Sequence, residues 1–205
     1  FVNINAIYIN EEDQHLWAVD AGDPFEGKML AAAAKLVEID LKTDKVVNVF
    51  FFEDQLPEGS HLNDMRIDGN TVYLTESGIG SILLLDRKTG RIRRLLSESS
   101  ITKGNDASNI RVEGIPLLGQ DGKPPIVHAD QIELSPQKDL LYFMSPFKPV
   151  IYRVPTADLK NESLSESELE QRIVADRTVV PLGGYLMDKK GNFYFSEIET
   201  QSITC

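Results

Sequence analysis

The sequence of 205 residues predicts an all-β protein made of repeated four-stranded units. Short runs of β-branched and aromatic residues alternate with turn residues, and a helical pattern is confined to one segment. Similar turns, Lys42-Thr43-Asp44 and Arg87-Lys88-Thr89-Gly90, separate the last two strands of the first two units. Four-stranded units that recur at about 40 to 50 residues are typical of β-propeller blades. We therefore predict a β-propeller, with a two-sheet sandwich as the alternative.

The first two units show the repeat most clearly. Alternating or continuous apolar runs mark the strands, and Asp40 and Asp86, each beside a Lys-Thr turn, are expected to cap their hairpins. The first unit is assigned to residues 1–55 and the second to residues 61–97. Their expected strands are residues 6–9, 16–20, 35–40 and 46–52, followed by 63–68, 71–75, 81–86 and 91–96.

The third unit, residues 127–176, and the fourth, residues 183–205, follow the same order. The fourth has only its first two strands and part of a third. Because an open ring leaves sheet edges unpaired, we expect a fragment of about three and a half blades, closed by further blades or by a second chain. The strands expected here are residues 131–135, 140–143, 150–154 and 172–174, then 185–188, 193–195 and 202–205.

Two insertions interrupt the repeat. Residues 97–125 are rich in Gly, Pro, Asn and Asp, a composition typical of a long loop on one face of the propeller. Residues 157–171 contain a Ser/Glu-rich stretch in which Ser165 and Glu168 have the spacing of a helix capping box. We expect a short acidic helix there.

Composition excludes several classes of partner. The 21 Lys and Arg residues against 32 Asp and Glu residues give a formal net charge of −11. Such a charge repels phosphate backbones and anionic lipids, so nucleic acid and membranes are not expected partners. No apolar run reaches the roughly 18 residues that a spanning helix needs. The single cysteine, Cys205, leaves no thiol cluster that could hold zinc.

Polar residues at the beginning of each innermost strand form the candidate site. In a propeller these positions surround the mouth of the central channel, where ligands bind. Equivalent positions of neighbouring units are close in space, so Asn63, Asp64, His128 and Asp130 are expected to share one cavity. The complete set of candidate ligand-binding residues is Asn5, Asn63, Asp64, His128, Asp130, Gln131 and Tyr185.

Each of these residues has more than one interpretation. Asn63 and Asp64 offer oxygen atoms for a polar ligand or for Ca²⁺, or they form an Asx turn that caps the strand. His128 is the candidate proton donor or acceptor, with a purely structural histidine as the alternative. The four convergent residues include two carboxylates and no Lys or Arg, so the mouth is expected to attract a cation, preferably a protonated amine.

Several segments carry a family resemblance that covers nearly the whole chain. In register and in order, they resemble the yellow / major royal jelly protein family, and residues 154–159 with the following Ser/Glu segment resemble its bacterial, dopachrome-tautomerase-related branch. The resemblance implies a six-bladed propeller, a secreted or periplasmic location, and a distant relation to gluconolactonase-type propellers. The segments are Lys35–Thr43, His61–Asp64, Asp130–Pro136, Leu141–Phe143 and Tyr152–Thr156.

The resemblance implies a small-molecule-binding propeller with tautomerase-like chemistry. A metal-dependent, lactonase-like hydrolase and a non-catalytic platform for protein interactions are the alternatives. In the lactonase-type relatives the position of Asp130 supplies an oxygen to a metal, so Asn63 and Asp130 are the candidate Ca²⁺ ligands. Gly183 stands where those relatives carry an Asp that serves as metal ligand and general base. This departure weakens the prediction of lactone hydrolysis.

Overall fold

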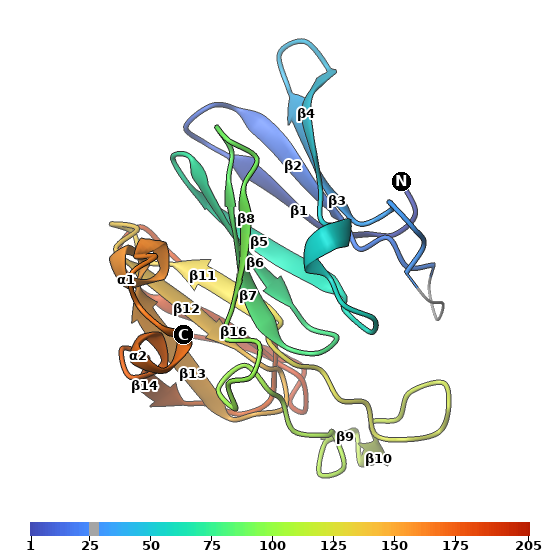
Figure 1. Cartoon of the computed structure of the whole chain (residues 1–205). Helices are drawn as coiled ribbons and strands as arrows, with labels where there is room; N and C mark the ends of the chain where they lie inside the picture. The colour runs from blue at the N-terminus through green and yellow to red at the C-terminus, as the bar shows by residue number, and fades with distance from the viewer. Residues whose placement is uncertain (25–28) are drawn as a thin grey trace.

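The computed structural model describes residues 1–24 and 29–205, and these form an all-β propeller arrangement with four blades (Figure 1). Each of the first three blades is a four-stranded antiparallel sheet in sequence order, and the fourth has three strands. The sandwich alternative is wrong, because each repeated unit forms its own sheet. No helix among the described residues is long and apolar enough to cross a membrane.

The observed strands follow the expected ones closely, mostly within two residues at each end. Blades 1 and 2 contain β1 (Ile4–Asn10), β2 (His15–Asp20), β3 (Lys35–Asp40), β4 (Lys45–Phe51), β5 (Leu62–Asp68), β6 (Thr71–Glu76), β7 (Ser81–Asp86) and β8 (Ile92–Leu95), with the 3-10 helix η1 (Glu53–Gln55) between them. Blades 3 and 4 contain β11 (Gln131–Leu134), β12 (Leu140–Met144), β13 (Val150–Pro155), β14 (Val174–Thr178), β15 (Leu182–Met187), β16 (Phe193–Glu197) and β17 (Ser202–Thr204).

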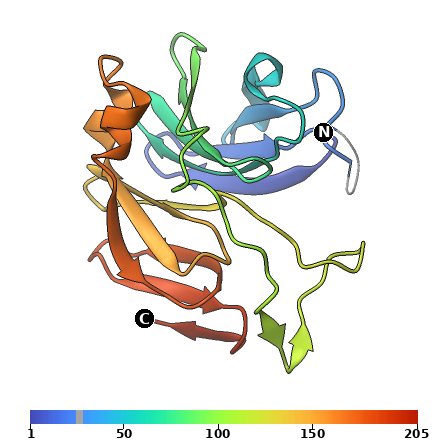
Figure 2. The ribbon, with the colours of Figure 1, turned by 60° about the horizontal axis from the view of Figure 1, so that its bottom comes forward.

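Successive blades pack face to face, as Figure 2 shows by the order of its colours from blue to red. Apolar residues from both sheets fill each interface; Trp17 and Leu36 meet Met65 and Leu85 between blades 1 and 2. The innermost strands β1, β5, β11 and β15 are in contact with their neighbours in this order. This arrangement brings the beginnings of four strands to one place, although they are far apart in the sequence.

The turns are fixed by aspartate side chains, as the Lys-Thr pattern predicts. The Asp40 carboxylate accepts hydrogen bonds from the Lys42 N–H and the Thr43 hydroxyl. Asp86 accepts from the backbone N–H groups of Lys88 and Thr89. In each hairpin the carboxylate satisfies turn donors that the strand ladder leaves unpaired, so the prediction that these residues cap their hairpins is confirmed.

The insertions differ from the expectation in detail. The expected acidic helix is two short helices, α1 (Thr156–Lys160) and α2 (Glu166–Glu170), and the Ser165–Glu168 capping box is present. The outer strand predicted at 172–174 lies instead at β14. The long loop carries a small hairpin of β9 (Arg111–Val112) and β10 (Ile115–Pro116) (Figure 1), and the Arg111 N–H donates to Glu199 Oε1, just after β16.

Candidate functional site

A cavity of about 290 Å³ opens where the four innermost strands begin. We call it the inner-strand cavity. Six of the seven predicted ligand-binding residues line it, and Gly183 and Gly184 complete its polar wall. Its lining residues are Asn5, Ala6, Ile7, Asn63, Asp64, Asp130, Gln131, Ile132, Gly183, Gly184 and Tyr185.

Irregular strand pairing shapes this cavity. The register shifts between Ile4 and Ala6 in β1, between Leu62 and Met65 in β5, and between Leu182 and Gly184 in β15. A β-bulge redirects side chains at the point where it occurs and is common beside binding sites. The irregularity in β5 explains how consecutive residues, Asn63 and Asp64, both reach the cavity, although strict alternation would send one of them to the opposite face.

The surroundings of the Asp130 carboxyl change its pKa. Burial, reinforced by the nearby Asp64 carboxylate, raises its pKa to about 6. The charge of His61 and a hydrogen bond from Asn63 act in the opposite direction without cancelling these effects. Asp130 therefore changes its charge near neutral pH, the range in which a carboxyl group can exchange protons with a ligand.

We expect Asp130→Asn to stabilise the ligand-free chain at pH 8. Because folding raises the pKa of Asp130 above its ordinary value of 3.8, the stabilisation from its neutral form is complete below that value and is lost as pH rises through about 6. The neutral amide avoids this loss, so the gain at pH 8 is on the order of 1 to 3 kcal/mol. Urea unfolding at pH 8 and pH 4 measures it, and an equal effect at both pH values would contradict the assignment.

Arg66 neutralises the charge of the other carboxylate at the cavity, that of Asp64. Its Nη1 lies 2.9 Å from Asp64 Oδ2, and its Nε lies 2.9 Å from Glu133 Oε1. The guanidinium also lies 5.5 Å from the centre of the Tyr8 ring. The mouth is thus less acidic than the four predicted residues alone suggested, since the charge of Asp64 is paired and Asp130 has no such partner among the described ion pairs.

Two buried polar atoms at the cavity have no hydrogen-bond partner within the described part of the chain. Gln131 is 6% exposed; its Nε2 donates to the Leu182 carbonyl, but its Oε1 has no donor. Tyr185 is 8% exposed and its hydroxyl is also unpartnered. Burial raises the pKa of Tyr185 well above its usual value, so it remains a neutral phenol. An unsatisfied buried acceptor is costly, and a ligand that donates a hydrogen bond would relieve this cost.

The donor set does not suit the calcium site that the lactonase-type resemblance implies. Ca²⁺ takes roughly six to eight oxygen ligands. Asp64 is already bonded to a guanidinium, the Asn63 amide donates to Ser77 Oγ at 3.0 Å, and Gly183 has no side-chain oxygen. A divalent cation beside Arg66 would meet its positive charge, so we derive no step through a metal.

Restoring the missing carboxylate is expected to create calcium affinity. A Cβ at Gly183 would meet its nearest atom, Ser196 Oγ, at 3.6 Å, which is ordinary contact, so Gly183→Asp should fold. Gly183 lines the cavity together with Asn63 and Asp130, so a carboxylate at this position would add oxygen ligands for Ca²⁺. We expect millimolar CaCl₂ to raise the melting temperature of Gly183→Asp by more than about 2 °C and to leave the parent unchanged. An equal shift in both would show that calcium binds elsewhere.

His128 does not line the inner-strand cavity, so its predicted place in the shared mouth is wrong. Its ring Nδ1 accepts a hydrogen bond from the Gly104 N–H at 3.0 Å, and its backbone N–H donates to the Ser77 carbonyl at 3.0 Å. Burial, together with the Lys103 charge, lowers its pKa. Residues 97–125 fold back on this histidine through Gly104, and no local pattern in the sequence predicts this contact.

The structure adds a histidine that was not among the predicted site residues. His61 Nδ1 lies 2.9 Å from Asp23 Oδ2, and its Nε2 lies 3.3 Å from Asn5 Oδ1. His61 and Asp23 also line a neighbouring cavity of about 520 Å³. His61 precedes the predicted Asn63 by two residues, but nothing in the sequence pairs it with Asp23, which belongs to the loop after β2.

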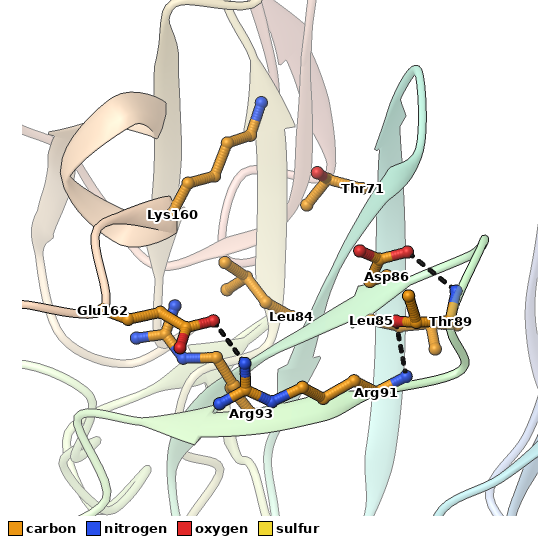
Figure 3. Close-up of a pocket in the computed structure, with 9 residues that line it drawn as sticks. All are labelled: Thr71, Leu84, Leu85, Asp86, Thr89, Arg91, Arg93, Lys160 and Glu162. Atoms are coloured by element: carbon orange, nitrogen blue, oxygen red, sulfur yellow. Dashed lines mark hydrogen bonds and ion pairs between the residues drawn. The ribbon is translucent and has the colours of Figure 1, made fainter.

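A groove on the outer side of blade 2 is a weaker candidate. It measures about 420 Å³ and lies between the end of β7, β8 and the segment after α1. Its cations are already engaged: Arg91 pairs with Glu162 at 2.5 Å, as Figure 3 shows, and Lys160 pairs with Asp68 at 2.7 Å. Arg93 donates to the Leu159 carbonyl. These contacts hold blade 2 against α1 and the loop that follows it. We therefore interpret the groove as a structural contact between these elements and not as a binding site.

The described residues contain one group with metal-ligand composition, Asp13, His15 and Glu38, in the outer half of blade 1. Arg87 Nη2 lies 2.8 Å from Asp13 and 2.5 Å from Glu38, and its guanidinium stacks over Trp17. The guanidinium occupies the place that a cation would need. The group is therefore an ion-pair network between blades 1 and 2.

Comparisons with known proteins agree with this architecture. The family model described as major royal jelly protein matches residues 4–205. No curated protein matches the chain. Hydrazine synthase from Kuenenia stuttgartiensis is 13% identical with a TM-score of 0.60, over 97% of this chain and 56% of that one.

Two further solved structures have the same arrangement. The WD40 β-propeller domain of Doa1 is 9% identical with a TM-score of 0.52, over 98% of this chain and 49% of that domain. A protein of unknown function from Bacteroides thetaiotaomicron is 12% identical with a TM-score of 0.52, over 98% and 41% of the two chains. The chain thus spans about half the length of the structures it matches. Likeness at this identity concerns the fold alone.

Proposed function

Because the chain belongs to the major royal jelly protein family, we propose that it is a small-molecule-binding β-propeller whose ligand occupies the inner-strand cavity. The observation that carries this proposal is the pair of unpartnered buried atoms, Gln131 Oε1 and Tyr185 Oη, at a cavity that also holds Asp130. Isolated polar atoms of this kind are costly in a folded protein unless a ligand completes them. The three groups come from two adjacent innermost strands.

The ligand that fits these groups carries a protonated amine. Asp130 supplies a carboxylate without an ion-pair partner among the described residues, and Gln131 Oε1 can only accept. The Tyr185 hydroxyl can donate or accept, and the exposed side chain of Ile7 offers an apolar surface for the body of the ligand. Arg66, paired with Asp64 and Glu133, keeps the remaining charge of the site balanced. An aromatic amine satisfies each of these features.

Tautomerase-like chemistry is the activity we propose for such a ligand. A tautomerisation moves one proton between two atoms of the same molecule and needs a group that exchanges protons near neutral pH. Asp130, with its pKa raised to about 6, is the group in contact with the cavity that suits this step. His128 lies outside the cavity. The lactonase-like alternative has less support, since Gly183 provides neither a metal ligand nor a base.

Isothermal titration of the chain with tyramine at pH 8 tests the proposal, with 4-hydroxyphenylacetate as a matched anion and CaCl₂ as a third titrant. Asp130 is ionised at this pH, so tyramine is expected to bind and the anion is not. Binding of the anion alone would contradict the proposal, because the Asp130 carboxylate repels an anion. The outer groove, where Figure 3 shows the ion pair of Arg91 with Glu162, would then be the next place to examine. Heat from CaCl₂ alone would favour the hydrolase alternative.

Two broad apolar surfaces support a proposal about assembly. On blade 1, Ile7, Ile9 and Phe51 are exposed, and on blade 4, Leu186 and Ile203 are exposed. The corresponding faces between the described blades are buried and apolar. We propose that further blades, of this chain or of a second one, cover them, and that the protein is exported, as the family resemblance suggests. Use of the propeller as a protein-interaction platform would also cover these faces.

A further inference from the structure

Gln131 differs from the other polar residues of the inner-strand cavity because only one half of its amide is bonded. It lies at the start of β11 and is 6% exposed. Its Nε2 donates to the Leu182 carbonyl on β15, whereas its Oε1 has no donor among the described residues. Gln131 lines the cavity together with Asp130. The unpartnered acceptor therefore belongs to the same site as the carboxylate assigned above to the ligand's ammonium group.

The Leu182 carbonyl fixes the orientation of this amide. The oxygen and nitrogen ends of a side-chain amide have almost the same size, so its partners decide which end points where. A backbone carbonyl can only accept a hydrogen bond, so the end of Gln131 that meets Leu182 is the nitrogen. Reversing the amide would place two oxygens against each other. Gln131 Oε1 is thus left as an acceptor.

The β15 side of the cavity leaves room for a ligand near this acceptor. The register of β15 shifts between Leu182 and Gly184, and both Gly183 and Gly184 line the cavity. A Cβ at Gly184 would meet no atom within 4 Å, and a Cβ at Gly183 would meet its nearest atom at 3.6 Å. These two positions therefore place no side chain that would exclude a methyl group on a ligand by its size.

We propose that Gln131, oriented by the Leu182 carbonyl, is the specificity-determining residue that selects primary and secondary amines over tertiary and quaternary ones. The Asp130 carboxylate attracts any organic cation through its charge, whereas Gln131 Oε1 is satisfied only by a hydrogen-bond donor. A ligand without a spare N–H shields this acceptor from water and cannot replace the hydrogen bond that water makes, so its affinity is lower. This inference rests on the proposed function, because it names the amines that the same site accepts.

The test is a methylation series, in which tyramine and its N-methyl, N,N-dimethyl and N,N,N-trimethyl derivatives are titrated into the parent chain at pH 8 by calorimetry. All of them are cations at this pH, and each methyl group removes one N–H. We expect N-methyltyramine to bind like tyramine, because its two N–H groups serve Asp130 and Gln131 together. The second methyl group leaves one N–H for two acceptors, so the affinity should fall about tenfold at this step.

Gln131→Met is the variant that separates the hydrogen bond from size and charge. It keeps the length of the side chain and removes the acceptor, so the fall at the second methyl group should disappear. Gln137→Met, at an exposed position in the turn after β11, is the matched control and should retain the fall. A loss that begins at the first methyl group and persists in Gln131→Met would show exclusion by size and would overturn the inference.

The same series distinguishes this inference from the proposed function. Equal affinity for all the amines in the parent would overturn the inference and leave the proposed function standing. If no amine binds the parent, the proposed function fails, and the inference fails with it.

A measurement on the parent alone keeps the inference testable if Gln131→Met does not fold. In ¹⁵N NMR spectra we expect saturating tyramine to shift the side-chain amide signals of Gln131 and to leave those of Gln137 in place. The N,N,N-trimethyl derivative should shift the Gln131 signals far less at equal occupancy. If the Gln131 signals do not move although tyramine binds, the inference is wrong.

Discussion

Replacing Arg66 by methionine is expected to destabilise the chain by about 3 to 5 kcal/mol, because it leaves the Asp64 and Glu133 carboxylates without their shared partner. Arg66 is 13% exposed and bonds both carboxylates, one on its own strand and one on β11 of the next blade. The same environment raises its pKa further above its ordinary value, so it is charged at every accessible pH. Urea unfolding followed by circular dichroism measures the loss.

Arg91→Met is the matched control for this prediction. Arg91 pairs with Glu162 at 2.5 Å, but both side chains are more than half exposed. Exposed pairs contribute about 0 to 1 kcal/mol, so this variant should unfold almost like the parent. The triple variant Arg66→Met, Asp64→Asn, Glu133→Gln removes the buried charges together and should recover a large part of the stability. Equal losses in Arg66→Met and Arg91→Met would contradict the account of the buried pair.

Asp130→Asn is expected to weaken tyramine binding by at least about 30-fold, or about 2 kcal/mol. The amide keeps the shape of the side chain and loses the charge that the ammonium group needs. In the parent, affinity should rise as pH increases through about 6, where Asp130 ionises, and this rise should be absent in the variant. Titration calorimetry between pH 5 and pH 8 measures both effects.

The control for this prediction is Asp86→Asn. Asp86 carries the same group at the outer groove, where it caps a hairpin, as Figure 3 shows. We expect its removal to leave tyramine affinity unchanged. Because Asp130→Asn is also expected to be the more stable protein at pH 8, unfolding cannot account for a loss of binding there. An unchanged affinity in Asp130→Asn would exclude Asp130 from the site.

The sequence was a good guide to the strands because their signals are local. Alternating apolar residues and Asx turns such as those of Asp40 and Asp86 depend on neighbours within a few positions, and they placed most strands within two residues. The outer strand of blade 3 was misplaced because the segment between α2 and β14 lacks such a signal. The residues of β14 are mostly exposed, so apolar and polar positions alternate only weakly along it. Its pairing with β13 decides where the strand lies.

The site was only partly predictable because its contacts are not local. Repetition of the units placed Asn63, Asp64 and Asp130 at one cavity, since equivalent positions of adjacent blades are neighbours. The pairing of His61 with Asp23 and of Arg66 with Glu133 depends on loop paths and on the distance between blades. His128 has the right position in the repeat, but the long loop engages it through Gly104.

A crystal structure of the chain with tyramine at pH 8 would show directly whether the amine binds in the inner-strand cavity. We expect the ammonium group to lie within hydrogen-bond distance of the Asp130 carboxylate and Gln131 Oε1, with the ring against Ile7. Both buried acceptors would then be satisfied. Tyramine bound in the outer groove, or bound anywhere with the inner-strand cavity empty, would contradict it.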